Sequence, residues 1–411
     1  MKRLLIAGGS HSDIPLIQAA QSRGYHVITS GNRADDMGHR YSNEVHLADF
    51  SDREAMLSLA RRMDIEALCS SSNDFSVITC AYIAEILGLP GFDDYQTTLT
   101  IHHKDRFKAV ASQLGLPSPV ARTFSAPDIS PGDLAGLPYP LMVKPIDLTG
   151  GKGISRIDSA DQLARAVERA FDISRAKRIV IETFFPGTLH SCSSIIRDRK
   201  VIFEFADDEF CFSSPYLVTT STSPAAVDPS VLPALRAATE ALAERLHLAD
   251  GLLHCQFIVN GRDFQVLEYT RRCSGDFYPV PVRHSMGVDH ADLILQPSLG
   301  ITPSVPANIR QQGFFSRHCV MTDKEGEILG LEIDDEIRGN ILETFTLLRP
   351  GEFIRNHLRD KAAVMILHYR SAAEMMEKTQ RITSLIRLSM AADAGAEAQE
   401  LSSLNLNRSV Q

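Results

Sequence analysis

Two lysines and a run of glycines lie close together in the stretch LMVKPIDLTGGKGISRI, residues 141–157. Lys144 ends an apolar run, and Lys152 follows within a glycine-rich segment before the chain turns apolar again. Lysines and glycines suit a phosphate site, because backbone N–H groups approach an anion closely where no side chain intervenes. The stretch is not a P-loop, since glycine follows Lys152 where Ser or Thr is required. It predicts a strand, a glycine hinge and a second strand.

A second set of polar residues alternates along a predicted hairpin. The segment LLHCQFIVNGRDFQVLEYTRR has Asn260-Gly261 near its centre, which is a strong short-range hairpin signal. Successive side chains of a strand point to opposite faces, so Glu268, Thr270 and Arg272 share one face. A carboxylate, a hydroxyl and a guanidinium are therefore expected side by side.

Composition limits the class of protein. The 411 residues suffice for two or three domains, and the 44% hydrophobic and 23% charged content is ordinary for a globular chain. The net charge of −9 argues against nucleic acid or an anionic membrane surface as a partner. Seven scattered cysteines without a C-x-x-C pair indicate reduced thiols in a cytoplasm and argue against zinc. The apolar run in the opening MKRLLIAGG is too short for a signal peptide and predicts a first strand.

The first 95 residues alternate short apolar strands with helices. Helical spacing follows the strands RLLIAG, YHVIT and IEALCSSS, over residues 13–23, 51–63 and 77–89. The second helix is predicted to begin at Ser51 as N-cap, with Glu54 completing a capping box. This alternation predicts right-handed crossovers and a parallel sheet. Gly8-Gly9 lacks the G-x-G-x-x-G pattern, so we interpret it as a structural turn and not as a dinucleotide site.

Later segments give clear element boundaries. A helix from His102 is expected to stop at Gly115, because prolines follow closely. A long helix is predicted over 230–248, between the strand-like runs of 178–196 and the hairpin. From about residue 300 onward, short strands and helices suggest a smaller α+β element.

Taken in order, these segments resemble an ATP-grasp carboxylate–amine ligase. The branch is the one that includes L-amino-acid ligases, carbamoyl-phosphate synthetase and biotin carboxylase. The resemblance covers roughly residues 1–390 and rests on H-K-D-R-F-K, V-K-P, the glycine loop, I-E-T-F-F-P-G-T-L-H, H-C-Q-F and L-E-Y-T-R-R-C-S-G-D-F. Each motif alone is weak, whereas their order and spacing together are specific.

The resemblance implies a fold of α/β and α+β type. The expected parts are a Rossmann-like parallel α/β domain (1–95), a two-lobed ATP-grasp domain (96–300) with a small lid lobe (about 120–186), a C-terminal α+β element completing the large lobe (301–392), and a tail (393–411). The tail is polar and weakly patterned, so disorder is expected there.

The resemblance also implies an ATP site. Lys104 and Lys144 would contact the phosphates, as compact point charges. The loop that contains Gly150, Gly151, Lys152 and Gly153 would close over the phosphates and exclude water.

Adenine and ribose contacts follow from the same resemblance. The Glu182 carbonyl would accept from the adenine amino group, and the Phe185 N–H would donate to the ring. His190 is the polar candidate for a ribose contact, although a purely structural hydrogen bond is as common for a lone histidine.

A metal site is implied on the hairpin. Mg²⁺ (or Mn²⁺) takes hard oxygen ligands from one or two carboxylates and the substrate phosphates. The matching residues are Gln256, Glu268 and Thr270, with Thr270 standing where the family pattern E-x-N-x-R has Asn. A threonine hydroxyl can ligate Mg²⁺, as in P-loop proteins. Asp276 is a possible additional acid, with a surface role preferred.

The implied reaction transfers the γ-phosphoryl group of ATP to a small carboxylic acid, after which an amine displaces phosphate. Lys144 and Arg272 would steady the transferring phosphoryl group, and the Gly275 amide would face the substrate carboxylate. An amino acid is the preferred acid. Residues 207–225 and 278–287 would line its pocket, where Arg283 or His284 would meet a second carboxylate or else form surface ion pairs.

Alternatives remain open on the sequence alone. One is an enzyme that phosphorylates bicarbonate or carbamate, and another is an ATP-binding regulator without catalysis, as the threonine at 270 suggests. A nicotinamide-dependent oxidoreductase is not supported by the glycine pattern. The expected partners are ATP and small carboxylate and amine substrates, and a homodimer is the assembly that relatives often form.

Overall fold

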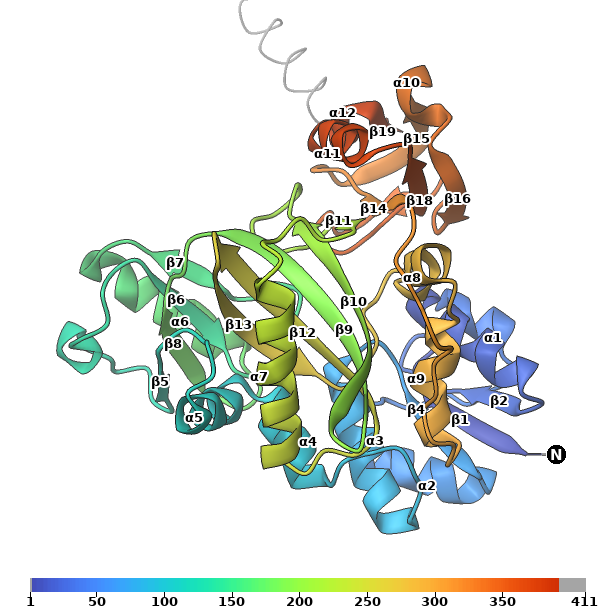
Figure 1. Cartoon of the computed structure of the whole chain (residues 1–411), viewed down its shortest axis with the longest axis horizontal. Helices are drawn as coiled ribbons and strands as arrows, with labels where there is room; N and C mark the ends of the chain where they lie inside the picture. The colour runs from blue at the N-terminus through green and yellow to red at the C-terminus, as the bar shows by residue number, and fades with distance from the viewer. Residues whose placement is uncertain (1, 392–411) are drawn as a thin grey trace, which may run out of the picture.

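The structure, a computed structural model, describes residues 2–391 and contains four β-sheets with helices packed against them (Figure 1). The N-terminal sheet (blue) and the small sheet of β5 to β8 (teal) lie at opposite sides of the central sheet, and the C-terminal elements (orange to red) lie above, where some of their strands extend the central sheet. The predicted combination of α/β and α+β architecture is confirmed. Within this part of the chain, no helix has both the length and the apolarity to cross a membrane. The tail predicted for 393–411 lies outside the described residues.

The N-terminal sheet is parallel, in the order β3-β2-β1-β4. Its strands are β1 (Arg3–Ala7), β2 (His26–Thr29), β3 (Glu44–Val45) and β4 (Ala67–Ser70). The helical elements are η1 (His11–Asp13), α1 (Ile14–Ser22), η2 (Met37–Tyr41), α2 (Arg53–Met63) and α3 (Asp74–Leu87). Leu4 and Ile6 pack toward α1 and the distant α9 (His290–Ser298), whereas Leu5 and Ala7 pack toward α2 and α3. Alternation along β1 thus buries both faces.

Two local predictions in this region have different outcomes. The N-cap of α2 is Asp52, whose carboxylate accepts from two backbone N–H groups, so the prediction of Ser51 was wrong by one residue. The Ser51 hydroxyl instead donates to Asp49 at 2.8 Å. The interpretation of Gly8-Gly9 as a structural turn agrees with the packing, because a Cβ on Gly9 would lie 2.1 Å from the His39 ring.

The small sheet is antiparallel, in the order β5-β8-β6-β7, and follows α4 (Tyr95–His102) and α5 (Lys104–Leu114). Its elements are β5 (Ala121–Phe124), η3 (Pro131–Leu134), β6 (Leu141–Pro145), β7 (Ser155–Ile157), η4 (Ala160–Gln162), α6 (Leu163–Ile173) and β8 (Ile179–Thr183). The predicted strand, glycine hinge and strand are β6, its loop and β7. Leu141 and Val143 of β6 pack in the core with α6, so Met142 and Lys144 face the other side. We call this sheet with α6 the lid.

The central sheet has eight strands in the order β13-β12-β9-β10-β11-β14-β18-β16. They are β9 (Thr188–Arg197), β10 (Lys200–Phe210), β11 (Thr220–Ser223), β12 (Gly251–Asn260), β13 (Asp263–Thr270), β14 (Phe314–Val320), β16 (Ile341–Thr346) and β18 (Ala363–Tyr369). The predicted hairpin is β12 and β13, with Gly261 in the left-handed region at φ 65°. Helix α7 (Val231–Arg245) covers one face, and α8 (Pro279–Met286) packs on the other.

The C-terminal elements complete the fold. Strands β14, β16 and β18 extend the central sheet, while β15 (Gly326–Ile333), β17 (Phe353–Ile354) and β19 (Ile386–Met390) form a sheet of their own. Helices α10 (Asp335–Arg338), α11 (Ala372–Gln380) and α12 (Ile382–Leu385) accompany them. The C-terminal region therefore contributes strands to the same sheet that carries the predicted metal residues.

Candidate active site

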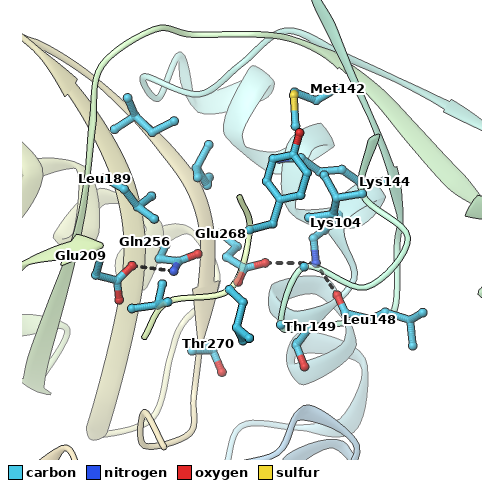
Figure 2. A pocket seen from close by; sticks show the side chains of 18 of the residues that line it. Lys104, Met142, Lys144, Leu148, Thr149, Leu189, Glu209, Gln256, Glu268 and Thr270 are labelled. Carbon is cyan, nitrogen blue, oxygen red and sulfur yellow. Dashed lines mark hydrogen bonds and ion pairs between the residues drawn. The ribbon is translucent and has the colours of Figure 1, made fainter. Parts of the chain in front are cut away.

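A cavity of about 380 Å³ lies between the lid and the central sheet (Figure 2). This volume is within the range of small-molecule sites. Most of the residues predicted from the sequence line it: Lys104, Lys144, Gly150, Gly151, Glu182, Phe185, Gln256, Glu268, Thr270, Arg272 and Gly275. Segments far apart in the chain are thus brought together around one cavity.

Lys104 crosses the cavity from the first turn of α5. Its Nζ lies 3.0 Å from Glu268 Oε2 and donates to the Leu148 carbonyl at 3.0 Å (Figure 2). Burial alone would lower the pKa of Lys104, but the neighbouring Glu268 carboxylate raises it. Lys104 is therefore a buried, charged lysine that joins α5, the glycine loop and β13.

Lys144 belongs to a buried charged triad that the sequence did not reveal. Its Nζ contacts Glu182 Oε1, and Lys108 Nζ lies 3.0 Å from Glu182 Oε2. Burial raises the pKa of Glu182, but the two lysines outweigh it and bring that pKa to about 2. Burial also lowers the pKa of Lys108 to about 8, against the attraction of Glu182. The Glu182 side chain thus fixes Lys144, a role beyond the backbone contact that we predicted.

The glycine loop lies against the segment 211–219, which connects β10 and β11. Gly150 and Gly151 line the cavity with φ of 66° and 72°, and a Cβ on Gly151 would lie 2.6 Å from Tyr216 Cβ. Lys152 is exposed and does not line the cavity. Gly153 packs toward Pro145 and Ile173 instead. Of the four predicted loop residues, only the first two face the cavity in this arrangement.

The predicted metal residues are adjacent on β12 and β13. Gln256 pairs directly with Glu268, and Thr270 lies two residues further on the same face. The Gln256 amide donates to Glu209 Oε2 at 2.6 Å (Figure 2), which leaves its carbonyl oxygen as an acceptor. Carboxylate, amide and hydroxyl oxygens suit Mg²⁺. No cluster of three or more Asp, Glu, His or Cys suited to a metal occurs in residues 2–391, so phosphate oxygens would have to complete the set.

Arg272 forms an ion pair with a carboxylate of the N-terminal α/β domain. Its Nε lies 2.6 Å from Asp74 Oδ1, at the start of α3, and His102 Nδ1 lies 3.3 Å from the same oxygen. Burial raises the pKa of Asp74, but Arg272 and His102 lower it well below its usual range. Thr270 also donates to this oxygen, at 3.3 Å. Arg271 does not line the cavity and pairs with Asp93 at 2.8 Å.

No family profile matches the sequence. A formate-dependent phosphoribosylglycinamide formyltransferase from Paraburkholderia xenovorans (strain LB400) is 27% identical over 192 residues, 44% of this chain and 46% of that protein. The chain spans about half the length of the curated relatives that it matches.

The solved structures cover nearly the whole chain. An L-amino acid ligase from Bacillus licheniformis superposes with a TM-score of 0.80 at 20% identity, over 95% of this chain and 99% of that one. The chain has the ATP-grasp fold. A biotin carboxylase domain of 2-oxoglutarate carboxylase from Hydrogenobacter thermophilus, in complex with MgADP, ADP and bicarbonate, has a TM-score of 0.75 at 15% identity, over 95% and 91%.

In this ATP-grasp fold, His190 is not placed to contact a ribose. Leu189 lines the cavity, and the next residue of β9 must point to the opposite face. There, His190 Nδ1 lies 2.8 Å from Asp208 Oδ1, and its Nε2 lies 2.6 Å from the Thr188 hydroxyl. The prediction of a ribose contact is corrected, because both ring nitrogens are engaged away from the cavity.

Of the two segments predicted to line the substrate pocket, 207–225 contributes to the cavity and 278–287 does not. Glu209 and residues 215–218 line the ATP-grasp cavity, but Arg283 and His284 do not. Those two contact Glu343 at 3.3 and 2.5 Å on another face of the molecule. Of the two possibilities that the sequence left open for Arg283 and His284, the ion pairs outside the cavity are the ones that form.

Asp276 also differs from its predicted surface role. Its carboxylate is buried at the cavity wall, 2.5 Å from Lys361 Nζ and 3.0 Å from His11 Nε2. Burial raises its pKa, but Lys361 and His11 bring it well below the usual value. Asp276 thus joins the N-terminal and C-terminal regions beside Gly275.

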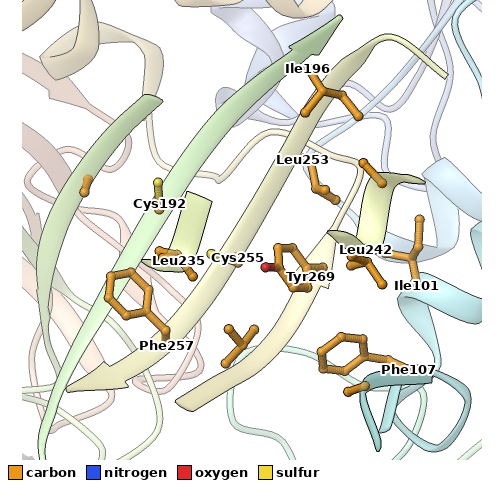
Figure 3. Close-up of a cluster of buried hydrophobic side chains, with 14 of the residues drawn as sticks. Ile101, Phe107, Cys192, Ile196, Leu235, Leu242, Leu253, Cys255, Phe257 and Tyr269 are labelled. Carbon is orange, nitrogen blue, oxygen red and sulfur yellow. The ribbon is translucent and has the colours of Figure 1, made fainter. Parts of the chain in front are cut away.

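A hydrophobic core fixes the strands of this ATP-grasp site from behind (Figure 3). Leu253, Cys255 and Phe257 of β12 alternate with the cavity residue Gln256, and Tyr269 of β13 lies between Glu268 and Thr270. These core side chains pack against α7 and α5. A one-residue shift in register would therefore exchange the core with the site.

Phe185 remains a predicted adenine contact. The Thr183 and Phe184 N–H groups donate to the Val120 and Pro140 carbonyls, at 3.0 and 3.1 Å. Within the described residues, the Phe185 N–H has no protein acceptor, and Phe185 lines the cavity. This arrangement suits a donor to a nucleobase.

The buried triad predicts a large effect of Glu182→Gln on stability. The change leaves Lys108 and Lys144 without their counter-charge, so the free energy of unfolding should fall by about 3–5 kcal/mol. Urea titration measures it. Asp158→Asn, which breaks the exposed Arg156–Asp158 pair, is the control, with an expected change within about 0.5 kcal/mol. Equal losses in the two variants would contradict the assignment.

The low pKa of Glu182 predicts how this difference depends on pH. A carboxyl with a pKa of about 2 when folded and roughly 4.3 when unfolded stabilises the fold above the unfolded value. That stabilisation is lost as the pH falls through the folded pKa. The difference in stability between wild type and Glu182→Gln should be full at pH 7 and shrink between about pH 4.5 and 2. A constant difference over this range would exclude the ion pairs as its source.

Proposed function

We propose that this protein is an ADP-forming, ATP-dependent ligase that activates a small carboxylic acid as an acyl phosphate and joins it to an amine. The observation that carries the proposal is the convergence of Lys104, Lys144 and Arg272 on one cavity with Glu268. Such a concentration of buried cations suits a polyphosphate. The relation to ATP-grasp ligases supports the same reaction class.

In this proposal, the nucleotide lies between the lid and the central sheet. The adenine would meet the backbone at Glu182 and Phe185, and the phosphates would meet Lys104 and Lys144 under the glycine loop. Glu268, Gln256 and Thr270 would hold Mg²⁺ or Mn²⁺, which neutralises phosphate charge. Lys104 and Glu268 lie 3.0 Å apart, so the lysine that would contact phosphate stands beside the carboxylate that would hold the metal.

The proposed reaction has two steps, and neither needs a nucleophile from the protein. A carboxylate oxygen of the acid forms a bond to the γ-phosphorus while the bond to ADP breaks. The amine nitrogen then bonds to the acyl carbon, the C–O bond to phosphate breaks, and the nitrogen's proton leaves with phosphate. Arg272, oriented by Asp74, would steady the equatorial oxygens, and the Gly275 amide would face the acid.

An amino acid is the preferred acid substrate, as one structural neighbour is an L-amino acid ligase.

We further propose a cytoplasmic location, as the scattered cysteines suggest. We also propose a homodimer, which analytical ultracentrifugation would test.

The proposal predicts ADP release that depends on Lys144. Protein with Mg²⁺, ATP and a panel of amino acids should release ADP, and Lys144→Ala should lower the rate by at least about 100-fold, because positioned charge is the main source of catalysis here. A coupled assay for ADP measures it. The control is Lys200→Ala, which removes an exposed lysine outside the cavity.

The outcomes separate the alternatives. ADP release with bicarbonate alone would favour a carboxylase-like reaction. Nucleotide binding without turnover on any acid would favour a regulator, and equal rates in the Lys144→Ala and Lys200→Ala variants would refute the proposed site.

A further inference from the structure

One wall of the cavity carries charged residues that the reaction above does not use. Glu209 on β10 pairs with Ser221 on β11, which in turn pairs with Arg317 on β14. Directly paired residues share a face of a sheet, so Glu209 and Arg317 both point to the cavity side. Both line the cavity and are buried, at 8% and 5% exposure.

Arg317 lacks an acidic partner. Its only hydrogen bond in the described part of the chain is from Nη1 to the Gly275 carbonyl, at 2.6 Å, and its buried Nε has none. No carboxylate of residues 2–391 lies within ion-pair distance of this guanidinium. A buried arginine that no carboxylate contacts directly is costly unless a ligand supplies an anion. Because it contacts Gly275, Arg317 stands beside the predicted position of the substrate carboxylate.

Glu209 lacks a cationic partner in the same way. One of its oxygens accepts from the Gln256 amide, and no lysine, arginine or histidine of the described chain forms an ion pair with it. Asp207, two residues earlier on the same face, accepts from the Ser191 hydroxyl.

The spacing leaves room for a small molecule between the two charges. Two strand intervals separate Glu209 from Arg317, roughly 10 Å between backbones. The side chains face one cavity without meeting each other. A ligand with a cation at one end and an anion at the other would satisfy both at once.

We propose that this wall binds the acid substrate as an amino-acid zwitterion, with its ammonium group on Glu209 beside Asp207 and its carboxylate on Arg317 beside Gly275. The proposal rests on the proposed function for the fate of the carboxylate, but the binding site stands on its own geometry. It assigns to Glu209 the selection of amino acids over simple carboxylic acids.

The test compares each of the twenty L-amino acids with its des-amino carboxylic acid, in wild type and Glu209→Gln. Wild type should prefer the best amino acid by at least about 100-fold in kcat/KM, because the des-amino acid leaves buried carboxylates unpaired. In Glu209→Gln this preference should fall at least 10-fold, through KM, with MgADP affinity unchanged within about twofold. Glu204→Gln is the matched control, since Glu204 lies on β10 but pairs with Arg236 on the other face.

A second measurement separates this inference from the ligase reaction. Calorimetry of amino-acid binding in the presence of MgADP needs no turnover, and binding should weaken at least 10-fold in Glu209→Gln and in Arg317→Gln. Two variants are used in case one of them does not fold, and circular dichroism shows whether each is folded. If ADP release fails but this binding pattern appears, the ligase proposal fails and the subsite stands. If des-amino acids bind or react as well as amino acids, or both folded variants bind like wild type, the subsite is refuted.

Discussion

Buried positive charge is the constraint on which the site depends. Lys104, Lys108 and Lys144 lie almost fully inside the protein, where an ammonium group without a counter-charge is expensive. Glu268 and Glu182 supply that charge, and each joins different parts of the fold: Glu268 connects β13 to α5, and Glu182 connects β8 to α5 and β6. The same carboxylates that make the lysines tolerable also fix their direction. A polyphosphate therefore meets cations that are already desolvated and oriented, which is the basis of electrostatic preorganisation.

Strand alternation separates this charged layer from the core. On β6, β8 and β12, residues of one parity pack against α5, α6 or α7, and residues of the other parity face the cavity. On β13 a register shift opposite Gln256 and Phe257 interrupts the alternation, so that both Leu267 and Glu268 line the cavity. The arrangement lets short sequences carry packing and chemistry together. It also explains why the sites tolerate no slippage, since the hydrophobic side determines which polar residues are presented.

Sequence patterns identified those features that are local or periodic. Lys144 with the glycine loop, and Glu268 with Thr270 and Arg272, were recognisable because their spacing follows a strand and a hairpin. The ribose contact predicted for His190 was wrong because neighbouring residues of β9 lie on opposite faces. Leu189 faces the cavity and His190 does not, and no sequence pattern indicated which of the two would do so. Asp74 and Lys108 were missed because their partners lie far along the chain, although the four-residue spacing of Lys104 and Lys108 on α5 was a usable signal. Asp276 shows the same limit: its partners, His11 and Lys361, come from opposite ends of the chain.

The contact of Asp74 with Arg272 has a consequence for how the protein can vary. The small parallel sheet lies outside the two lobes that form the cavity, yet one of its helices begins with the carboxylate that orients a cavity arginine. Exchange of the N-terminal domain between related chains would therefore also exchange Asp74, the residue that orients Arg272. When domains of this fold recombine, the contact between Asp74 and Arg272 is expected to be kept. The amino-acid sequence of the exposed face of the lid is expected to vary more freely.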